Sequence, residues 1–427
     1  MEKILQPIRG MSDILANDIP IWSRVEKVCK EIFKQYGYQE IRIPIVEKAD
    51  LYERSIGQST DIIEKEMYIF KDRNGDSLAL RPEATAGVIR AGLSNGIFHN
   101  TQQKLWCSGP MFRHERPQKG RYRQFNQVSV EAVGFPSAEI DAELIAISSR
   151  LWKKLKLESP FLEINSLGSF EDRKLYRKDL LSFLSAHKNI MDDETLSRLA
   201  KNPLRILDSK NPEIIDIIKN APRLIDYLGE TSKNHFQKLK DLLDQINIKY
   251  SLNVNLVRGL DYYSKTVFEW KTNKLGSQDA ICSGGRYDDL VEQLGGSATP
   301  AVGWALGIER VVNLIKEESI DVREDYPDIY LAMVGDRAQN YGFILSELLR
   351  EKIPTLRLSV DYLFGSLKSQ LRRADKSFSR IALIIGDNEI DQGVISVKML
   401  REKTEQFELT EDRLVSWLKS EALFFKK

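Results

Sequence analysis

Two apolar runs enclose a loop crowded with arginines in the segment LWCSGPMFRHERPQKGRYRQFNQVSVEAVG, residues 105–134. The pattern predicts strands over 104–112 and 124–134, joined by a long hairpin loop. Cations outnumber acids in this loop, which holds Arg113, Arg116, Lys119, Arg121 and Arg123 against Glu115. Guanidinium groups bind phosphates in a bidentate manner, so the loop suits a polyanion. A solvated basic surface has the same composition and stays an alternative.

Composition places the chain among ordinary soluble globular proteins. The 427 residues predict two or three domains, and 42% hydrophobic with 29% charged residues is typical of that class. A net charge of +1 gives no overall basic field, so a nucleic-acid partner has to be met by local patches. No apolar run approaches a membrane span, and charged residues interrupt the N-terminal segment. We expect a cytoplasmic protein that binds no membrane.

Cysteines and histidines show no metal-binding spacing. Cys29, Cys107 and Cys282 are far apart, and the four histidines are scattered. This pattern predicts a reducing compartment and no metal site built from histidine and cysteine clusters.

Three regions follow one another along the chain. Residues 1–325 mix helical patterns with short strands, and the stretch from about 170 to 248 inside them is almost wholly helical and is interpreted as an insertion. The charged stretch 316–327 is typical of a linker. Residues 328–427 alternate strands and helices, as a small α/β domain does. The linker therefore predicts a boundary between residues 325 and 328.

Some elements are predicted within these regions. We expect a helix over 20–36, strands over 40–46 and 252–257, and a helix from about 306 to 317. In the last region, Lys368, Arg372 and Lys376 form an i, i+4, i+8 row. The row is either a solvated helix face or a contact surface for a phosphate backbone.

If the chain binds a nucleotide, it uses a motif other than the common phosphate-binding loops. The sequence contains no GxxxxGK[ST] segment and no GxGxxG after a strand. The glycine-dotted stretch SGGRYDDL, residues 283–290, and GWALGIERV, residues 303–311, offer small residues where backbone can approach a flat ligand.

An ordered set of segments resembles the class II aminoacyl-tRNA synthetases. EIRIPIVEKADLYERSIG (40–57), FRHERPQKGRYRQF (112–125) and PAVGWALGIERV (300–311) are similar to motifs one, two and three of that class. LALRPEATAG (78–87) and LVRGLDYYSKTVFEW (256–270) narrow the resemblance to the histidyl-tRNA synthetase family, over essentially the whole chain.

The resemblance implies an α+β fold: a class II antiparallel-sheet catalytic core with the helical insertion, and a C-terminal α/β anticodon-binding domain. It implies a homodimer whose interface includes motif one. The implied reaction is activation of L-histidine by ATP, with Mg²⁺ accompanying the ATP, and transfer of histidine to the 3′ end of tRNA-His. No DNA partner is implied.

Site residues follow from the matched motifs. The resemblance implies catalytic roles for Arg113 and Arg258, at the α-phosphate where charge builds up. Other ATP contacts are implied for Glu115, Arg121 and Arg310. From its own sequence, Arg258 also fits a salt-bridge residue at a strand end.

Histidine selection needs groups that satisfy a buried imidazole and a buried ammonium. The resemblance implies Glu131 and Tyr263 for the imidazole, and Tyr262 for the same pocket. The α-amino group is assigned to Glu83, Thr85 and Gln127. For Glu131 alone, an ordinary strand-edge carboxylate is the alternative. Since such a site rejects other amino acids strongly, we predict no editing domain.

The last group of predicted site residues is expected to contact the tRNA. Arg116, Gln118 and Lys119 are expected at the acceptor end, and Lys368, Arg372 and Lys376 at the anticodon stem.

Two residues depart from the family pattern, Ala84 and Ser283, each of which stands where a glycine is usual. Neither removes a charge.

Two alternative functions remain. One is a non-catalytic, histidine-sensing regulatory subunit of ATP phosphoribosyltransferase, which characteristically lacks or alters the arginines and the C-terminal domain kept here. The other is a class II synthetase for threonine, proline or glycine, against which the RGLDYY segment argues.

Overall fold

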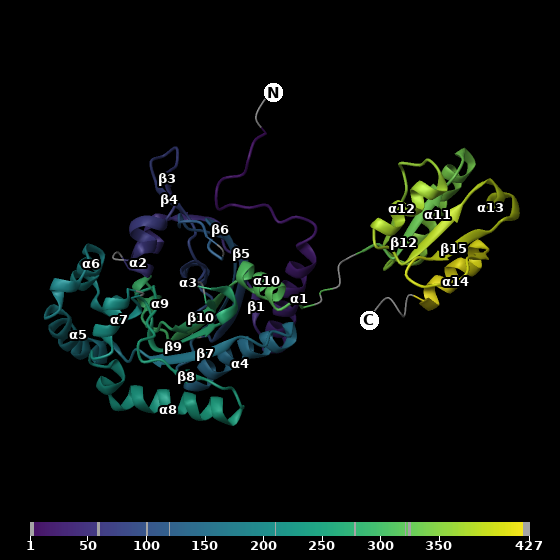
Figure 1. Cartoon of the computed structure of the whole chain (residues 1–427). Coiled ribbons are helices and arrows are strands. Elements are labelled where there is room, and N and C mark those ends of the chain that lie inside the picture. Colours follow the sequence, from purple (N-terminus) through teal and green to yellow (C-terminus); the bar gives the residue numbers. More distant parts are fainter. Residues whose placement is uncertain are drawn as a thin grey trace. The chain divides into compact units, whose positions relative to one another are not determined.

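The computed structural model describes residues 4–57, 60–99, 101–118, 120–209, 211–276, 279–320, 322 and 326–421. The chain divides into two compact units, Met1–Val322 and Arg323–Lys427 (Figure 1). Each unit has a sheet and a hydrophobic core of its own.

An eight-stranded sheet forms the centre of the first unit, in the order β1-β5-β6-β11-β10-β9-β7-β8. Its pairs are antiparallel except β1 with β5 and β7 with β8. This confirms the predicted antiparallel core. The strands are β1 Gln39–Glu40, β5 Gln103–Phe112, β6 Gln124–Val133, β7 Phe161–Ser166, β8 Ser251–Leu252, β9 Ser264–Lys271, β10 Ala280–Arg286 and β11 Ala301–Gly307.

The predicted hairpin is confirmed. Strands β5 and β6 pair from Gln103 opposite Val133 to Phe112 opposite Gln124. Residues 113–123 join them and are called the arginine loop here. The hairpin pairs without interruption along both strands, so the arginine loop starts and ends at the paired ends of β5 and β6.

Helices cover one face of this sheet and share its core. They are α1 Ile19–Gln35, α4 Ala138–Leu155, α8 Glu230–Gln245 and α10 Ile308–Glu317. In α1, buried Trp22, Val25, Cys29, Ile32 and Phe33 recur at helical spacing, so they form one apolar stripe. The helix predicted over 20–36 is confirmed. Phe33 packs against Trp106 of β5 and Trp304 of β11.

A smaller sheet and several short helices border the central sheet. The small sheet has the order β2-β4-β3, with β2 Val46–Lys48, β3 Ile69–Lys71 and β4 Ser77–Leu80. The helices are α2 Ala49–Ile56, η1 Ile62–Glu66, α3 Thr85–Ser94, α9 Leu290–Gln293 and η5 Asn273–Leu275. The strand predicted over 40–46 is wrong in its middle. The carbonyls of Ile43 and Pro44 instead accept from the Arg81 guanidinium, at 2.8 and 3.4 Å.

The region predicted to be helical is indeed a run of helices. It contains α5 Phe170–Ser185, η2 Lys188–Ile190, α6 Asp193–Lys201, η3 Pro203–Asp208, α7 Pro212–Ile218 and η4 Leu224–Tyr227, followed by α8. Side chains that accept from backbone amides begin four of these helices: Ser169, Asp192, Asn202 and Asn211. Buried Tyr176, Leu180 and Leu184 give α5 one inward face.

Two further predictions need correction. The strand expected over 252–257 ends at Leu252, because the Asn253 side chain accepts from the Asn255 amide at 3.1 Å and turns the chain. The glycine-rich segment before α10 contains a strand, β11, that the prediction missed. The helix predicted from about 306 begins at Ile308.

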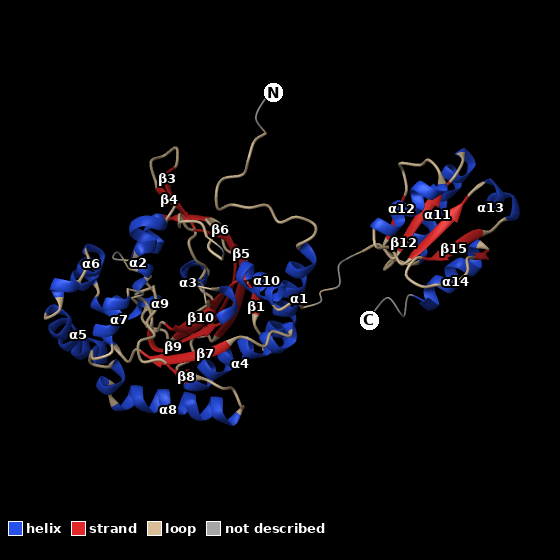
Figure 2. Ribbon diagram, viewed as in Figure 1, coloured by secondary structure: helices blue, strands red, loops and turns tan. Residues whose placement is uncertain are grey.

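The second unit holds a mixed sheet in the order β13-β12-β14-β15-β16. Strand β12 is parallel to β13 and β14, whereas β15 is antiparallel to its neighbours. Figure 2 shows this sheet with helices around it. The elements are β12 Ile329–Met333, β13 Leu358–Val360, β14 Ile381–Ile385, β15 Ile395–Met399, β16 Phe407–Leu409, α11 Asp336–Lys352, α12 Leu367–Lys376, α13 Asp387–Gln392 and α14 Glu411–Glu421. Every residue of β12 and β14 is buried, as in strands covered on both faces.

Candidate active site

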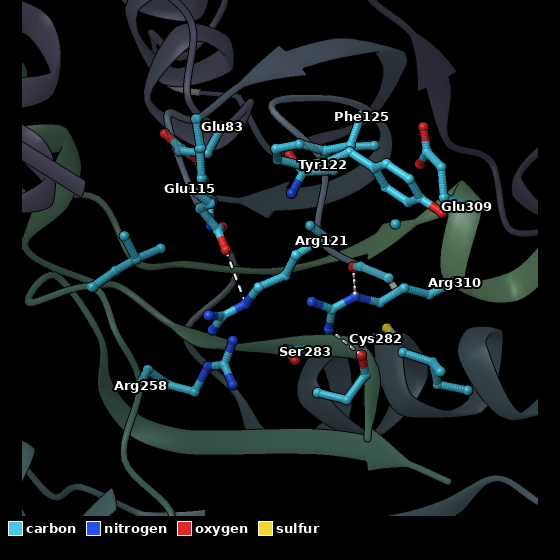
Figure 3. Close-up of a pocket in the computed structure, with 18 of the residues that line it drawn as sticks. Glu83, Glu115, Arg121, Tyr122, Phe125, Arg258, Cys282, Ser283, Glu309 and Arg310 are labelled. Carbon is cyan, nitrogen blue, oxygen red and sulfur yellow. Dashed lines mark hydrogen bonds and ion pairs between the residues drawn. The ribbon is translucent and has the colours of Figure 1, made fainter. Parts of the chain in front are cut away.

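A pocket of about 880 Å³, including its open mouth, lies beside β6, β10 and β11. Figure 3 shows Arg121, Arg258 and Arg310 pointing toward one open space from different parts of the chain. Most of the predicted site residues line this pocket: Glu83, Thr85, Arg113, Glu115, Arg121, Gln127, Arg258, Tyr262, Tyr263 and Arg310. Segments between residues 83 and 310 therefore meet at one site.

Glu83 sits at the start of α3 and is buried. Its two carboxylate oxygens accept from the amides of Thr85 and Ala86, at 2.7 and 2.8 Å. A carboxylate at a helix N-terminus is stabilised by those amides and by the helix dipole. Burial nevertheless raises the pKa of Glu83. Each oxygen keeps further acceptor capacity for an ammonium group.

Gln127 lines the pocket near Glu83 and is held by the backbone of the buried residue Ala84. The Gln127 side-chain oxygen accepts from the Ala84 amide at 3.2 Å, which fixes the amide group at the pocket. Ala84 has φ −98° and ψ −33°, so this position needs no glycine. The departure from the family pattern at Ala84 therefore costs no backbone strain.

Glu131 lies behind the pocket wall, on β6, and is fully buried. Its Oε1 accepts from Thr85 Oγ1 at 2.7 Å and from the Ser129 hydroxyl, and its Oε2 accepts from the Tyr287 hydroxyl. Burial raises the pKa of Glu131 to about 7. A side chain at Gly303 would begin 1.8 Å from Glu131 Oε2, so glycine leaves the space this carboxyl occupies. Glu131 is held as a core residue is, beside the pocket and in contact with Thr85.

Three tyrosine rings pack together at this end of the pocket. Ring centroids lie 4.7 Å apart for Tyr262 and Tyr263, and 5.6 Å apart for Tyr262 and Tyr287. Burial raises the pKa of each phenol, that of Tyr263 to about 12. The hydroxyls therefore stay protonated at neutral pH and can donate hydrogen bonds.

Arg258 is paired inside the pocket with Glu269 of β9. Its Nη1 donates to Glu269 Oε1, which also accepts from Ser283 Oγ at 2.9 Å. Burial opposes ionisation of Glu269, but the charges of Arg258 and Lys271 outweigh it and lower the pKa of this carboxyl. Among the described residues, the buried Nε of Arg258 has no acceptor. Arg258 is thus a salt-bridge residue whose Nε–H group can still donate a hydrogen bond to a ligand.

The other cations of the pocket are held by carbonyls and one carboxylate. Arg113 Nε donates to the Pro82 carbonyl at 2.8 Å, and its guanidinium lies 5.4 Å from the Phe125 ring centre. Arg310 donates to the carbonyls of Gly120 and Ala280, at 3.1 and 2.5 Å. Arg121 and Glu115 form an ion pair at 2.9 Å. Glu83 and Glu309 line the pocket as well as Glu115, so among its described lining residues four arginines face three carboxylates, a small excess of positive charge.

Sequence reasoning missed several residues of the site. Glu309, next to Arg310, accepts from the Asn126 amide at 2.8 and 3.0 Å, and burial raises its pKa. Tyr122 and Phe125 of the second motif also line the pocket. Glu269 and Tyr287 lie behind the pocket, where they bind Arg258 and Glu131, and their positions in VFEW and GGRYD were the available signals.

None of the predicted tRNA contacts within the described ranges is among the residues that line this pocket. Arg116 and Gln118 are exposed on the arginine loop and do not line the pocket, and Lys119 lies outside the described residues. In the second unit, Lys368, Arg372 and Lys376 are exposed on α12. Their neighbour Arg373 instead binds Asp361 at 2.7 Å.

Two absences hold for the part of the chain that the structure describes. Within it, no three histidine, cysteine or acidic side chains come together as metal ligands do. No helix in those ranges is both long and apolar enough to span a bilayer. Cys29, Cys107 and Cys282 are buried and form no disulfide.

Two family models match the chain. A model described as histidyl-tRNA synthetase matches residues 10–311, and one described as an anticodon binding domain matches residues 328–421. A curated histidine–tRNA ligase from Hydrogenovibrio crunogenus is 51% identical over 98% of this chain and 99% of its own length.

Solved structures agree in fold. The structure of apo S. aureus histidyl-tRNA synthetase matches with a TM-score of 0.82 and 34% identity, over 97% of this chain and all of that one. A Bacillus halodurans structure titled an ATP phosphoribosyltransferase regulatory subunit/histidyl-tRNA synthetase has a TM-score of 0.64 and 21% identity, over 90% and 99%. At that identity the second match shows the fold alone.

Proposed function

Because the chain belongs to the histidyl-tRNA synthetase family, we propose that it activates L-histidine with ATP and transfers the product to tRNA-His. The histidine carboxylate attacks the α-phosphorus, forming histidyl-adenylate and releasing pyrophosphate. The ribose at the 3′ end of the tRNA then takes the histidyl group and AMP leaves. The observation that carries the proposal is the pocket that brings Arg113, Arg258 and Arg310 together beside Glu83 and Thr85.

In the first step, negative charge builds on the α-phosphate oxygens and on the leaving pyrophosphate. Arg258 supports a role at the α-phosphate, since its Nε is a buried donor without an acceptor among the described residues. We assign Arg113 to the same phosphate, and Arg310, Arg121 and Glu115 to the rest of the nucleotide. No general base is needed, because the attacking carboxylate is already ionised, so positioning and electrostatics carry the rate.

Histidine recognition is proposed at the tyrosine end. Glu131 and Tyr263 bind the imidazole, Tyr262 lines the same pocket, and Glu83, Thr85 and Gln127 hold the α-amino group. The Glu131 carboxyl supports this role, because three hydroxyls hold it in place beside the pocket. A residue fixed in that manner discriminates between ligands that do and do not offer a matching donor.

Mg²⁺ is proposed to enter with ATP. The carboxylates of Glu115 and Glu309 line the pocket among the arginines and fit a hard divalent cation. When bound, the ion neutralises part of the phosphate charge.

Partners and boundaries complete the proposal. We propose that Arg116, Gln118 and Lys119 meet the acceptor end of the tRNA, and Lys368, Arg372 and Lys376 the anticodon stem. We also propose a homodimer, a cytoplasmic location and a domain boundary at residues 325–328. Exposed Ile45 and Val46 in motif one support the dimer, and the unpaired cysteines support a reducing compartment.

The test is ATP–pyrophosphate exchange with each of the twenty amino acids, for the wild type and for Arg258→Ala, followed by charging of tRNA-His. We expect exchange with histidine alone, strongly reduced in the variant. Histidine binding without exchange would instead support the regulatory-subunit alternative. Exchange with threonine, proline or glycine would support the other alternative.

A further inference from the structure

The segment RGLDYY, residues 258–263, is called the RGLDYY loop here. It carries three proposed site residues, yet residues 253–263 form neither helix nor strand. Strand pairing therefore does not hold these backbone positions, although the reaction requires them to be fixed. Irregular backbone at a site needs other partners for its carbonyls.

Side chains from the helical insertion supply those partners. Arg173 of α5 donates from Nη1 to the Tyr263 carbonyl at 2.9 Å. Arg205 of η3 donates from Nη2 to the Gly259 carbonyl at 3.0 Å and pairs with Asp261 at 3.1 Å. Asn202 donates to the same Asp261 oxygen at 3.0 Å. Both ends of the RGLDYY loop are thus held from outside the central sheet.

The arginines that make these contacts are largely buried, and hydrogen bonds from buried donors are little weakened by water. The Arg205 side chain is 12% exposed, and burial lowers the pKa of Arg173 without neutralising an arginine. Hydrogen bonds from a charged donor in such surroundings hold geometry better than exposed ion pairs do. The insertion also pairs Arg198 with Asp61 near η1, but this pair is 32% and 48% exposed and contributes little.

We propose that Arg173 and Arg205 are positioning residues for histidine activation, and that the insertion is therefore part of the catalytic apparatus. The inference rests on the proposed roles of Arg258, Tyr262 and Tyr263. Arg173 fixes the backbone of Tyr263, so its loss acts mainly on histidine binding. Arg205 fixes the peptide next to Arg258, so its loss acts mainly on the chemical step.

The experiment is ATP–pyrophosphate exchange by the full-length protein carrying Arg173→Ala, Arg173→Lys, Arg205→Ala or Arg205→Lys. Since a displacement of about 1 Å costs about 100-fold in rate, we expect losses of about 10- to 100-fold in kcat/KM for the alanine variants. Arg173→Ala should raise the KM for histidine, and Arg205→Ala should lower kcat. The lysine variants should recover part of each loss, because a donor remains.

Arg177→Ala is the matched control. Arg177 lies one turn further along α5, is exposed, and donates to the Lys201 carbonyl rather than to the RGLDYY loop. It should exchange as the wild type does. Thermal unfolding of every variant separates positioning from folding. Losses that follow the unfolding temperature, with no division between KM and kcat, overturn the inference.

Arg258→Ala is carried as a reference in the same assay. Wild-type exchange in Arg258→Ala contradicts the proposed role of Arg258. Wild-type exchange in Arg173→Ala and Arg205→Ala, together with an impaired Arg258→Ala, contradicts this inference alone.

Discussion

Glu131 occupies a core position and also has a proposed role in histidine binding. Three hydroxyl donors, from Thr85, Ser129 and Tyr287, satisfy its carboxyl, while burial removes it from water. Burial dominates, so the folded pKa lies above that of an exposed glutamate. The folded state therefore binds this proton more tightly than the unfolded state, and the contribution of Glu131 to stability falls as pH rises toward about 7.

This shift leads to a prediction about histidine binding. An ionised carboxylate accepts a stronger hydrogen bond from an imidazole N–H than a protonated carboxyl does, so kcat/KM for histidine should fall as pH drops through about 7. Pyrophosphate-exchange profiles of the wild type and Glu131→Gln are to be compared. The titration of histidine itself is common to both, so the step that disappears in the variant belongs to Glu131. Identical profile shapes would assign the step to the substrate.

Ser283 gives a second prediction at the residue scale. Its hydroxyl is one of the donors to Glu269, beside Arg258. Ser283→Gly, which restores the usual family residue, should lower the free energy of unfolding by about 1 kcal/mol, with less than about a threefold change in kcat, because Arg258 still holds Glu269. Denaturant unfolding and pyrophosphate exchange measure the two effects.

Ala84→Gly is the companion variant, since it also restores a family glycine but removes no hydrogen bond. It should destabilise through backbone entropy and through loss of a buried methyl group, by about 1–2 kcal/mol in all. A tenfold loss of kcat in Ser283→Gly would mean that the hydroxyl contacts a substrate directly.

At the scale of elements, the arginine loop has a fixed base and an exposed tip. The Arg113 amide donates to the Arg123 carbonyl at 3.0 Å, and the Arg123 amide donates to the Gly10 carbonyl at 2.7 Å. Arg116 and Gln118 beyond this base are exposed. The base suits the nucleotide pocket, and the tip suits a larger partner.

Arg116→Ala should therefore separate the two reactions. We expect the KM for tRNA-His to rise several-fold while pyrophosphate exchange stays unchanged, since Arg116 does not line the pocket. Aminoacylation and exchange are measured side by side, with Lys153→Ala on α4 as an exposed control. A parallel loss of exchange would place Arg116 in the activation step.

Helix α12 carries the other proposed tRNA surface. Arg372→Ala should weaken tRNA binding and reduce the slope of log affinity against log salt by about 0.7–0.9, the value for one lost phosphate contact. Arg413→Ala, an exposed arginine on α14 of the same unit, is the control. Equal salt slopes for Arg372→Ala and the wild type would leave α12 as a solvated face.

The elements also show what sequence can and cannot predict. Two apolar runs predicted β5 and β6, and helical spacing predicted α1, because each pattern is local. Strand β11 was missed because its glycines are typical of turns. In the structure it pairs with β6 on one edge and with β10 on the other. Arg258 and Glu269 are close in sequence, but Tyr287 reaches Glu131 only through long-range packing. No local sequence pattern predicts such a contact. The motifs therefore identified the arginines of the site, whereas partners such as Tyr287 were identified from the fold.

At the scale of the whole molecule, the small sheet β2-β4-β3 leaves apolar side chains in water. Val46 of β2 and Phe70 of β3, which the strand register places on one face of this sheet, are 40% and 42% exposed. Grouped apolar residues on a surface usually mark an interface. Val46 belongs to motif one, so a second copy of the chain is the occupant we propose. In a monomer, the exposed face of β2, which leads into α2, would then stay in contact with water.

Val46→Asp should weaken the proposed dimer by at least about 10-fold in Kd, because a charge buried in an apolar contact has no partner. Sedimentation equilibrium over a concentration series gives the Kd, and exchange activity in the same series shows whether the active sites need the dimer. Phe343→Asp is the control, since Phe343 is 53% exposed on α11 of the other unit. We expect it to dimerise as the wild type does. A monomeric wild type, or a Val46→Asp variant with unchanged Kd, would remove motif one from the interface. Activity that falls on dilution only as dimers dissociate would mean that pairing of two chains maintains the geometry of each pocket.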